Sequence, residues 1–201
     1  IVRHGETVWN VERRLQGHGD APLTQKGEEE IQELAQELRD IHFDHVYSSD
    51  LLRAKRTAEL LVVEKELVVN TTQLLRERTF GQYEGMLIAE FQEKNKELLA
   101  KEQSLSKEER RKFKLAEDME SSEEVMQRLL VFLREVAVTY PEKTILIVSH
   151  SGVLRILLEH LGYDVVHGRG MVKNGAYIKL LSDGVEFEVQ KIIGITLSEN
   201  K

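Results

Sequence analysis

Two stretches decide the fold, Ile1-Val2-Arg3-His4-Gly5 and Thr144-Ile145-Leu146-Ile147-Val148-Ser149-His150-Ser151-Gly152, and both run from apolar residues into histidine and then glycine. Continuous apolar runs are typical of strands buried on both faces of a parallel sheet. The glycine lets the backbone turn tightly where the run ends. Because open α/β sheets carry their sites at the carboxyl ends of such strands, the pattern predicts two central strands, each followed by a functional histidine.

The rest of the chain extends this pattern into alternating helices and strands. Apolar spacing predicts helices over 24–39, 51–63, 121–138 and 153–161, and strands over 45–49, 67–71, 144–149, 177–181 and 185–191. Thr24 is the expected N-cap of the first helix, and Ser49 or Asp50 is the expected N-cap of the second. We therefore expect an α/β fold, a three-layer sandwich whose mostly parallel central sheet has helices on both faces.

Residues 86–120 break the alternation, because they are rich in Lys and Glu and carry no strand signal. We interpret this segment as a small helical cap inserted into a single domain over 1–201. Within it, Arg110-Arg111-Lys112 is either a solvated stretch or a clamp for a second anionic group on a substrate. The sequence leaves these two readings open.

Composition narrows the function classes. The chain of 201 residues has no cysteine, which excludes disulfides, a thiol nucleophile and Cys-based metal sites. The net charge of −7 argues against broad binding to nucleic acid or anionic membranes. No apolar run reaches the roughly 20 residues of a membrane helix. We expect a cytoplasmic protein, and since the chain starts on Ile1 within a predicted strand, we expect a few residues to precede it.

The residues at the predicted strand ends suit phosphate chemistry. The guanidinium of Arg3 is a planar fork of donors that matches phosphate oxygens. His4 can act as a nucleophile at neutral pH, and we expect a hydrogen bond, such as one to a backbone carbonyl, to fix its tautomer. Arg53 falls in the first turn of the predicted second helix, where unpaired N–H groups also favour anions. Together these groups predict a local cationic pocket in an acidic protein.

Five motifs occur in order along nearly the whole chain. They are Arg3-His4-Gly5-Glu6-Thr7 with Asn10; Leu15-Gln16-Gly17 with Asp20, Pro22-Leu23-Thr24 and Gly27; Ser48-Ser49-Asp50-Leu51-Leu52-Arg53-Ala54 with Thr57-Ala58; Leu75-Arg76-Glu77-Arg78 with Gly81 and Glu84-Gly85; and Val148-Ser149-His150-Ser151-Gly152. In this order and spacing, they resemble the histidine phosphatase superfamily, in its phosphoglycerate-mutase-like branch.

The resemblance implies roles for individual residues. His4 would be the nucleophile that forms a phosphohistidine, and Glu77 would be the proton donor and acceptor, with Arg3, Arg53 and His150 stabilising charge. The phosphate-binding set that the resemblance implies is Arg3, Asn10, Gln16, Gly17, Arg53, His150 and Ser151. It implies no metal and no cofactor, since neighbouring arginines would repel a cation. The implied partner is a small phosphorylated substrate, with no nucleic acid or membrane.

Three functions share this pattern. A phosphatase passes the phosphoryl group to water, whereas a phosphoglycerate mutase passes it to another hydroxyl and a non-catalytic binding module transfers nothing. Mutases of the family carry a Tyr where this chain has Phe80 and a Lys that is absent after Gly85, so we favour the phosphatase, with sugar phosphates as plausible substrates.

Two further features bear on the cap and on assembly. The family's usual Gly-Glu-Ser reads Met119-Glu120-Ser121 here, which puts the cap-side contacts with substrate in doubt. The predicted hairpin is compatible with a homodimer, although nothing marks it strongly.

Overall fold

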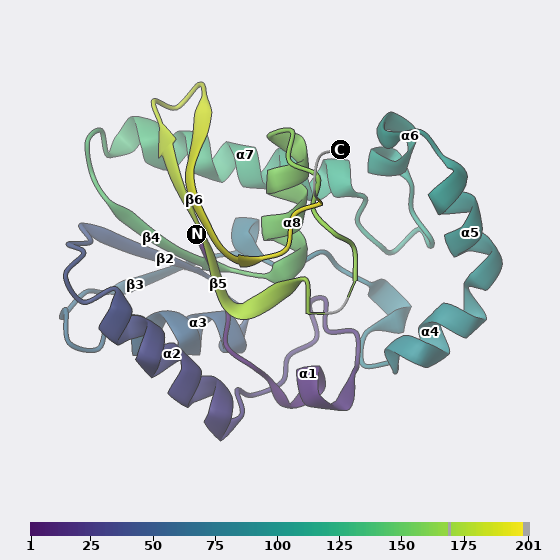
Figure 1. The fold of residues 1–201 in the computed structure, drawn as a ribbon, viewed down its shortest axis with the longest axis horizontal. Helices are drawn as coiled ribbons and strands as arrows, with labels where there is room; N and C mark the ends of the chain where they lie inside the picture. Colours follow the sequence, from purple (N-terminus) through teal and green to yellow (C-terminus); the bar gives the residue numbers. More distant parts are fainter. Residues whose placement is uncertain (169, 199–201) are drawn as a thin grey trace.

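The computed structural model describes residues 1–168 and 170–198 and contains a 6-stranded sheet in the order β3-β2-β4-β1-β5-β6 (Figure 1). The strands are β1 (Val2–Arg3), β2 (His45–Ser49), β3 (Val69–Thr72), β4 (Ile145–Ser149), β5 (Val172–Ser182) and β6 (Phe187–Ile195). β3, β2, β4 and β1 are parallel to one another. β5 pairs antiparallel with β1 on one side and with β6 on the other. The predicted α/β fold with a mostly parallel sheet is confirmed.

Helices cover both faces of the sheet. The helices are α1 (Val8–Glu12), α2 (Gln25–Glu37), α3 (Leu52–Leu61), α4 (Ile88–Lys94), α5 (Lys96–Ser104), α6 (Lys107–Lys112), α7 (Ser122–Thr139) and α8 (Ser151–His160). One hydrophobic cluster joins α2 and α3 to the sheet through Ile31, Ala54 and Val46, and a second joins α7 and α8 through Leu129 and Leu157. Figure 1 shows the two helix pairs on opposite sides of the strands.

The sheet order brings the two histidine-bearing strand ends together. β1 pairs directly with β4 in parallel, with Val2 opposite Val148 and Arg3 opposite Ser149. The backbone N–H of His4 donates to the Ser149 carbonyl over 3.1 Å. Because parallel neighbours end at the same edge, the residues that follow, His4 and His150, lie side by side at the carboxyl edge.

The predicted N-cap of α2 is confirmed, whereas the prediction for the N-cap of α3 is wrong. The Thr24 hydroxyl accepts the N–H of Gly27, as predicted. In α3 the N-cap residue is Leu51, which has no side-chain oxygen, and the Asp20 carboxylate accepts the N–H of Leu52 instead. Asp50 is engaged elsewhere, because Arg76 binds its carboxylate with two hydrogen bonds of 2.7 and 2.6 Å. A distant loop therefore does the capping that we expected of a local residue.

Residues 86–120, which we call the cap segment, contain α4, α5 and α6, to the right of the sheet in Figure 1. A small cluster fixes the segment to the body through Tyr83, Phe91 and Met119, whose exposed fractions are 6%, 7% and 1%. The Tyr83 hydroxyl also donates to Asn95 over 3.0 Å. Met119, which stands where the family usually has glycine, is thus a buried anchor of the cap segment.

Local boundaries differ in modest ways from the predicted ones. The hairpin is present, but β5 begins at Val172, well before the predicted start at 177, because its antiparallel pairing with β6 continues through a register shift. The short helix α1 has no counterpart in our prediction. It is a single capped turn, too short to show helical periodicity.

Candidate active site

His4 is buried at the edge between β1 and β4, and its ring is held in one orientation. The side chain is 3% exposed, and its Nδ1 lies 2.7 Å from the Gly5 carbonyl oxygen. Since a carbonyl only accepts, Nδ1 carries the proton and Nε2 keeps its lone pair. Burial, followed by the charges of Arg53 and Arg3, holds the pKa of His4 well below its usual value. The ring is therefore neutral at physiological pH, as a nucleophile must be.

His150 stands directly beside His4 and is completely buried. The two ring centroids are 5.2 Å apart with an angle of 61° between the planes. Neither ring nitrogen of His150 has a hydrogen-bond partner among the described residues. Burial, then the charges of Arg53 and His4, lowers the pKa of His150 as well. Because a buried polar atom without a partner is costly, these nitrogens are suited to receive a bound ligand.

Arg3 and Arg53 supply the positive charge of the site. Arg3 donates through Nη1 to the Val172 carbonyl, and burial lowers its pKa to about 10, which Glu77 opposes and Arg53 reinforces. Arg53 is 1% exposed and donates to the carbonyls of Gly17 (2.7 Å) and Gly19 (2.8 Å). In both arginines Nε is buried without a partner among the described residues. The two guanidinium groups therefore keep donor capacity for an anion.

The Arg53 side chain is seated on the loop that follows α1. Besides the two carbonyls, it pairs with Asp20, whose Oδ1 lies 3.2 Å from Nη1. Burial lowers the pKa of Arg53, and the nearby charges of Asp20 and Glu77 oppose that effect. The same Asp20 caps α3 from the N-terminal side, as described above. One carboxylate thus fixes both the start of the helix and the charged end of its arginine.

Glu77 lines the same cavity as the arginines and meets the start of α8. Its Oε1 accepts the N–H of Arg78 over 2.8 Å, and its Oε2 accepts the N–H of Gly152 over 3.0 Å. The Ser151 hydroxyl is 3.5 Å from Oε2. The carboxyl group is 8% exposed, so it is held in place yet open to the cavity. Glycine at 152 leaves room for the carboxyl group in this position, because a Cβ would come within 2.4 Å of Oε1.

These groups surround one cavity of about 740 Å³ at the carboxyl edge of the sheet. A volume of this size is typical of small-molecule sites. The predicted site residues that line it are Arg3, His4, Asn10, Gln16, Gly17, Arg53, Glu77 and Ser151. His150 lies behind the lining, against the His4 ring. The structure therefore brings all nine candidate residues to one place.

Asn174 is a contributor that the sequence did not reveal. From β5, its Nδ2 donates to the His4 carbonyl over 3.1 Å and lies 3.5 Å from Asn10 Oδ1. That Asn10 oxygen also accepts the N–H of Thr7, closing the N-terminal cap of α1. Asn174 precedes Gly175, whose φ is +68°, and this Asn-Gly pair within a strand was the one available signal. It holds the backbone of His4 and the amide of Asn10 together.

His18, Glu84, Glu120 and Arg128 form a second group, and none of them was among the predicted site residues. Both His18 Nε2 (2.9 Å) and Arg128 Nη2 (3.0 Å) are bonded to the Glu77 carbonyl. Arg128 also pairs with Glu120 over 2.8 Å. Burial acts to raise the pKa of Glu120, but Arg128 outweighs it and leaves the pKa lowered. His18 therefore helps to fix the backbone position of Glu77.

Arg110, the first residue of the basic run, stabilises the cap segment itself. Arg110 donates to the carbonyls of Glu102, Gln103 and Leu105, which closes the connection between α5 and α6. The residues of the cap segment that line the cavity are Ile88 and Gln92, both uncharged. The reading of Arg110 as a clamp for a second anionic group is therefore not supported by its position.

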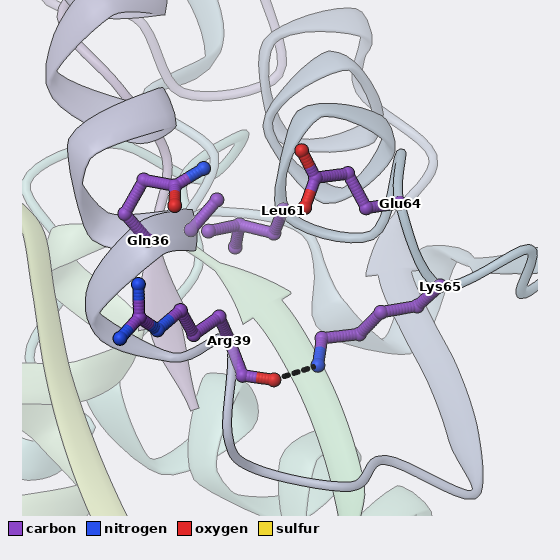
Figure 2. A pocket seen from close by; sticks show the side chains of 6 residues that line it. Gln36, Arg39, Leu61, Glu64 and Lys65 are labelled. Atoms are coloured by element: carbon purple, nitrogen blue, oxygen red, sulfur yellow. Dashed lines mark hydrogen bonds between the residues drawn. The ribbon is translucent and has the colours of Figure 1, made fainter.

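A second cavity, of about 120 Å³, lies between the C-terminal ends of α2 and α3 (Figure 2). Lys65 donates from Nζ to the carbonyls of Arg39 and Ile41, each over 2.8 Å, and so satisfies carbonyls beyond the end of α2. Both helices run back from the carboxyl edge, which places this cavity away from the histidines. Its lysine has a structural role.

The described part of the chain contains neither a cluster of metal ligands nor a membrane-spanning helix. Within 1–168 and 170–198, no three His, Asp or Glu side chains gather closely enough to hold a metal ion. Over the same ranges, no helix is both long and apolar enough to cross a membrane.

Comparison with known proteins gives consistent matches over nearly the whole chain. The model of the histidine phosphatase superfamily (branch 1) matches residues 1–193. The chain is 33% identical to "Uncharacterized phosphatase PhoE" of Bacillus subtilis (95% of this chain, 89% of the relative). It is 31% identical to "Phosphoglycerate mutase-like protein 4" of Arabidopsis thaliana (94% and 82%). Among solved structures, YhfR of Bacillus stearothermophilus superimposes with a TM-score of 0.83 at 26% identity (97% and 95%).

Proposed function

Because this chain belongs to the histidine phosphatase superfamily, branch 1, we propose that it is a phosphomonoester phosphatase that acts through a phosphohistidine on small phosphorylated metabolites, sugar phosphates among them. The observation that carries the proposal is His4, neutral and buried, with Nδ1 bound to the Gly5 carbonyl and two arginines beside it. This arrangement supports attack by Nε2 on a phosphorus atom whose oxygens are bound by cations.

In the first step, Nε2 of His4 forms a bond to phosphorus while the bond from phosphorus to the ester oxygen breaks. Arg3, Arg53 and His150 donate to the phosphoryl oxygens, where charge is spread in the transition state. Glu77, protonated at this stage, gives its proton to the departing alkoxide. The seat of Glu77 on the N–H groups of Arg78 and Gly152 supports this role, since it fixes the carboxyl group at the cavity.

In the second step, water attacks the phosphorus of the phosphohistidine. Glu77, now a carboxylate, accepts the proton of the water as the bond from Nε2 to phosphorus breaks. Inorganic phosphate leaves, and both His4 and Glu77 return to their starting states. No metal is needed in this scheme, because the arginines and His150 stabilise the charge.

The part of the cap segment that lines the cavity favours a phosphatase over a mutase. A mutase must retain its substrate while the phosphoryl group moves to another hydroxyl, which calls for charged side chains from the cap. Here the cap segment contributes the uncharged Ile88 and Gln92. A mutase remains the second candidate, since one relative is named "Phosphoglycerate mutase-like protein 4". A binding module of this fold is the third.

The test is phosphate release from a panel of phosphomonoesters, with and without EDTA. The panel holds p-nitrophenyl phosphate, fructose bisphosphates, 3-phosphoglycerate and phospho-amino acids. We expect turnover to survive EDTA, because Arg3 and Arg53 do the work that a cation would do. His4→Ala should abolish turnover and the trapped phosphoenzyme. His42→Ala is the matched control, since that histidine side chain is 87% exposed.

Each alternative gives a different result. Interconversion of phosphoglycerates without net phosphate release would indicate a mutase. Loss of turnover in EDTA would contradict the charge-stabilising roles of the two arginines. A protein that turns over no ester, and that keeps its ligand binding after His4→Ala, would be a binding module.

A further inference from the structure

The carboxylate of Glu84 lies between two loops of the candidate site. From the first loop, the N–H of His18 donates to Oε1 over 2.9 Å and the N–H of Gly19 donates to Oε2 over 2.7 Å. From the second, the Thr79 hydroxyl (2.9 Å) and the Phe80 N–H (3.0 Å) donate to Oε1. A single half-buried side chain therefore satisfies donors from both loops at once.

The first loop is the seat of Arg53. The carbonyls of Gly17 and Gly19 accept from the Arg53 guanidinium, while the N–H groups of His18 and Gly19 face Glu84. The loop packs directly on the carboxylate, because a Cβ on Gly17 would come within 2.2 Å of Glu84 Oε1. Since carbonyl and N–H groups belong to the same short run of peptide planes, fixing the N–H side also fixes the carbonyls.

The second loop carries Glu77. Thr79 and Phe80, which bind Glu84, follow Arg78, whose N–H donates to Glu77 Oε1. The first loop also reaches across, since His18 Nε2 is bonded to the Glu77 carbonyl. Gly17 and Phe80 line the cavity, and Glu84 stands behind them.

We propose that Glu84 is a positioning residue that sets the phosphate-binding Arg53 and the proton-donating Glu77 in fixed relation to each other. The proposal rests on the proposed function for the meaning of the two groups. Glu84 touches neither substrate nor reacting atoms; it acts through the two loops. Loss of the Glu84 carboxylate therefore weakens anion binding and slows proton transfer together. If the two loops were held by separate contacts, one substitution would impair only one of these functions.

Glu84→Gln tests this with almost no change of shape. The amide replaces one acceptor oxygen by a donor, so in either orientation an N–H of the amide faces a donor of one loop. Asp118→Asn is the matched control. The Asp118 carboxylate accepts the N–H of Gln82, two residues before Glu84, over 2.7 Å, and among the described residues it has no hydrogen bond to the first loop.

Two readouts report on the two groups separately. Binding of orthovanadate, which needs no turnover, reports on Arg53, and we expect it to weaken about tenfold in Glu84→Gln because charged hydrogen-bond donors are displaced. The ratio of activity on an alkyl phosphate to activity on p-nitrophenyl phosphate reports on Glu77, because nitrophenolate leaves without a proton. We expect the alkyl ester to lose about 10²-fold in kcat/KM, and the nitrophenyl ester less. Asp118→Asn should change neither readout.

The outcomes are decisive in each direction. Unchanged vanadate affinity, or equal losses on both esters, would overturn the proposal and leave Glu84 with a role in folding alone. A wild-type chain that hydrolyses no ester refutes the proposed function, and amide exchange then replaces the ester comparison. The Arg78 N–H, which donates to Glu77, should exchange faster in Glu84→Gln, and unchanged exchange overturns the proposal. Should Glu84→Gln not fold, Glu84→Asp, a shorter carboxylate, carries the same measurements.

Discussion

Gly152→Ala should separate the stability of this fold from its activity. A Cβ at this position would stand 2.4 Å from Glu77 Oε1, whereas ordinary contact begins at 3.4 Å. The carboxyl group must therefore retreat by about 1 Å to restore ordinary contact. A displacement of that size in a group that takes part in the reaction costs about 10²-fold in rate. The fold tolerates the change, because the obstructing atom is the end of a flexible side chain.

Stability should move the other way. Residue 152 lies in the first turn of α8, where alanine in place of glycine adds about 0.5–1 kcal/mol to the free energy of unfolding. Chemical denaturation measures that change. Steady-state kinetics with an alkyl phosphate and with p-nitrophenyl phosphate measures the loss, which should fall mainly on the alkyl ester, since its alkoxide needs a proton.

Gly162→Ala is the control, because no atom lies within 4 Å of its added Cβ. With φ at +89°, alanine there should cost about 1–2 kcal/mol of stability and leave kcat/KM unchanged. Full activity of Gly152→Ala on the alkyl ester would refute the reasoning, because Glu77 would then either lie elsewhere or not be the proton donor.

Two further predictions concern stability. Asp20→Ala should lower the free energy of unfolding by about 1–2 kcal/mol, because it uncaps α3 and unpairs Arg53. Urea denaturation measures this loss. The control is Asp50→Ala, at a residue first expected to cap α3, which should leave amide exchange at the start of the helix unchanged. Burial and the neighbouring arginines lower the pKa of His4 and His150 in the fold. As the pH is lowered, both histidines are therefore protonated more readily in the unfolded chain than in the folded one. Stability should therefore be complete above about pH 6.5 and fall below it, by up to about 1.4 kcal/mol per pH unit for each histidine. Two results would contradict the assignment of this pH dependence to the two histidines. One is a urea midpoint that stays constant as the pH is lowered below about 6.5, and the other is an equal decrease in His150→Gln.

The parts of the fold that the sequence revealed are those encoded by neighbouring residues. The apolar run before His150 and the periodicity of α7 depend on side chains a few positions apart, so the strand and the helix were both predictable. The capping hydroxyl of Thr24 is equally local, since it reaches an N–H three residues away. The order of the strands was not predicted, because no local pattern sets which strands become neighbours.

The parts that the sequence did not reveal depend on contacts between distant loops. Asp20 caps a helix that begins more than thirty residues later (|i−j| = 32), and no local signal marks that reach. Glu84 binds residues of two loops, one of them more than sixty residues away (|i−j| = 66). Asn174 meets His4 across most of the chain (|i−j| = 170). Such partners are set by the sheet order, which a reading of periodicity does not supply.

The position of β1 within the sheet has a consequence for the order of folding. Its two neighbours, β4 and β5, begin at Ile145 and Val172. During synthesis the first strand is therefore without partners until most of the chain has been made, and closing that long loop is slow. We expect His4 to reach its place among the last events of folding, so that shortened or partly made chains form helices and strands but bind no phosphate. A cell would then meet the candidate site only in the finished chain, never in a fragment.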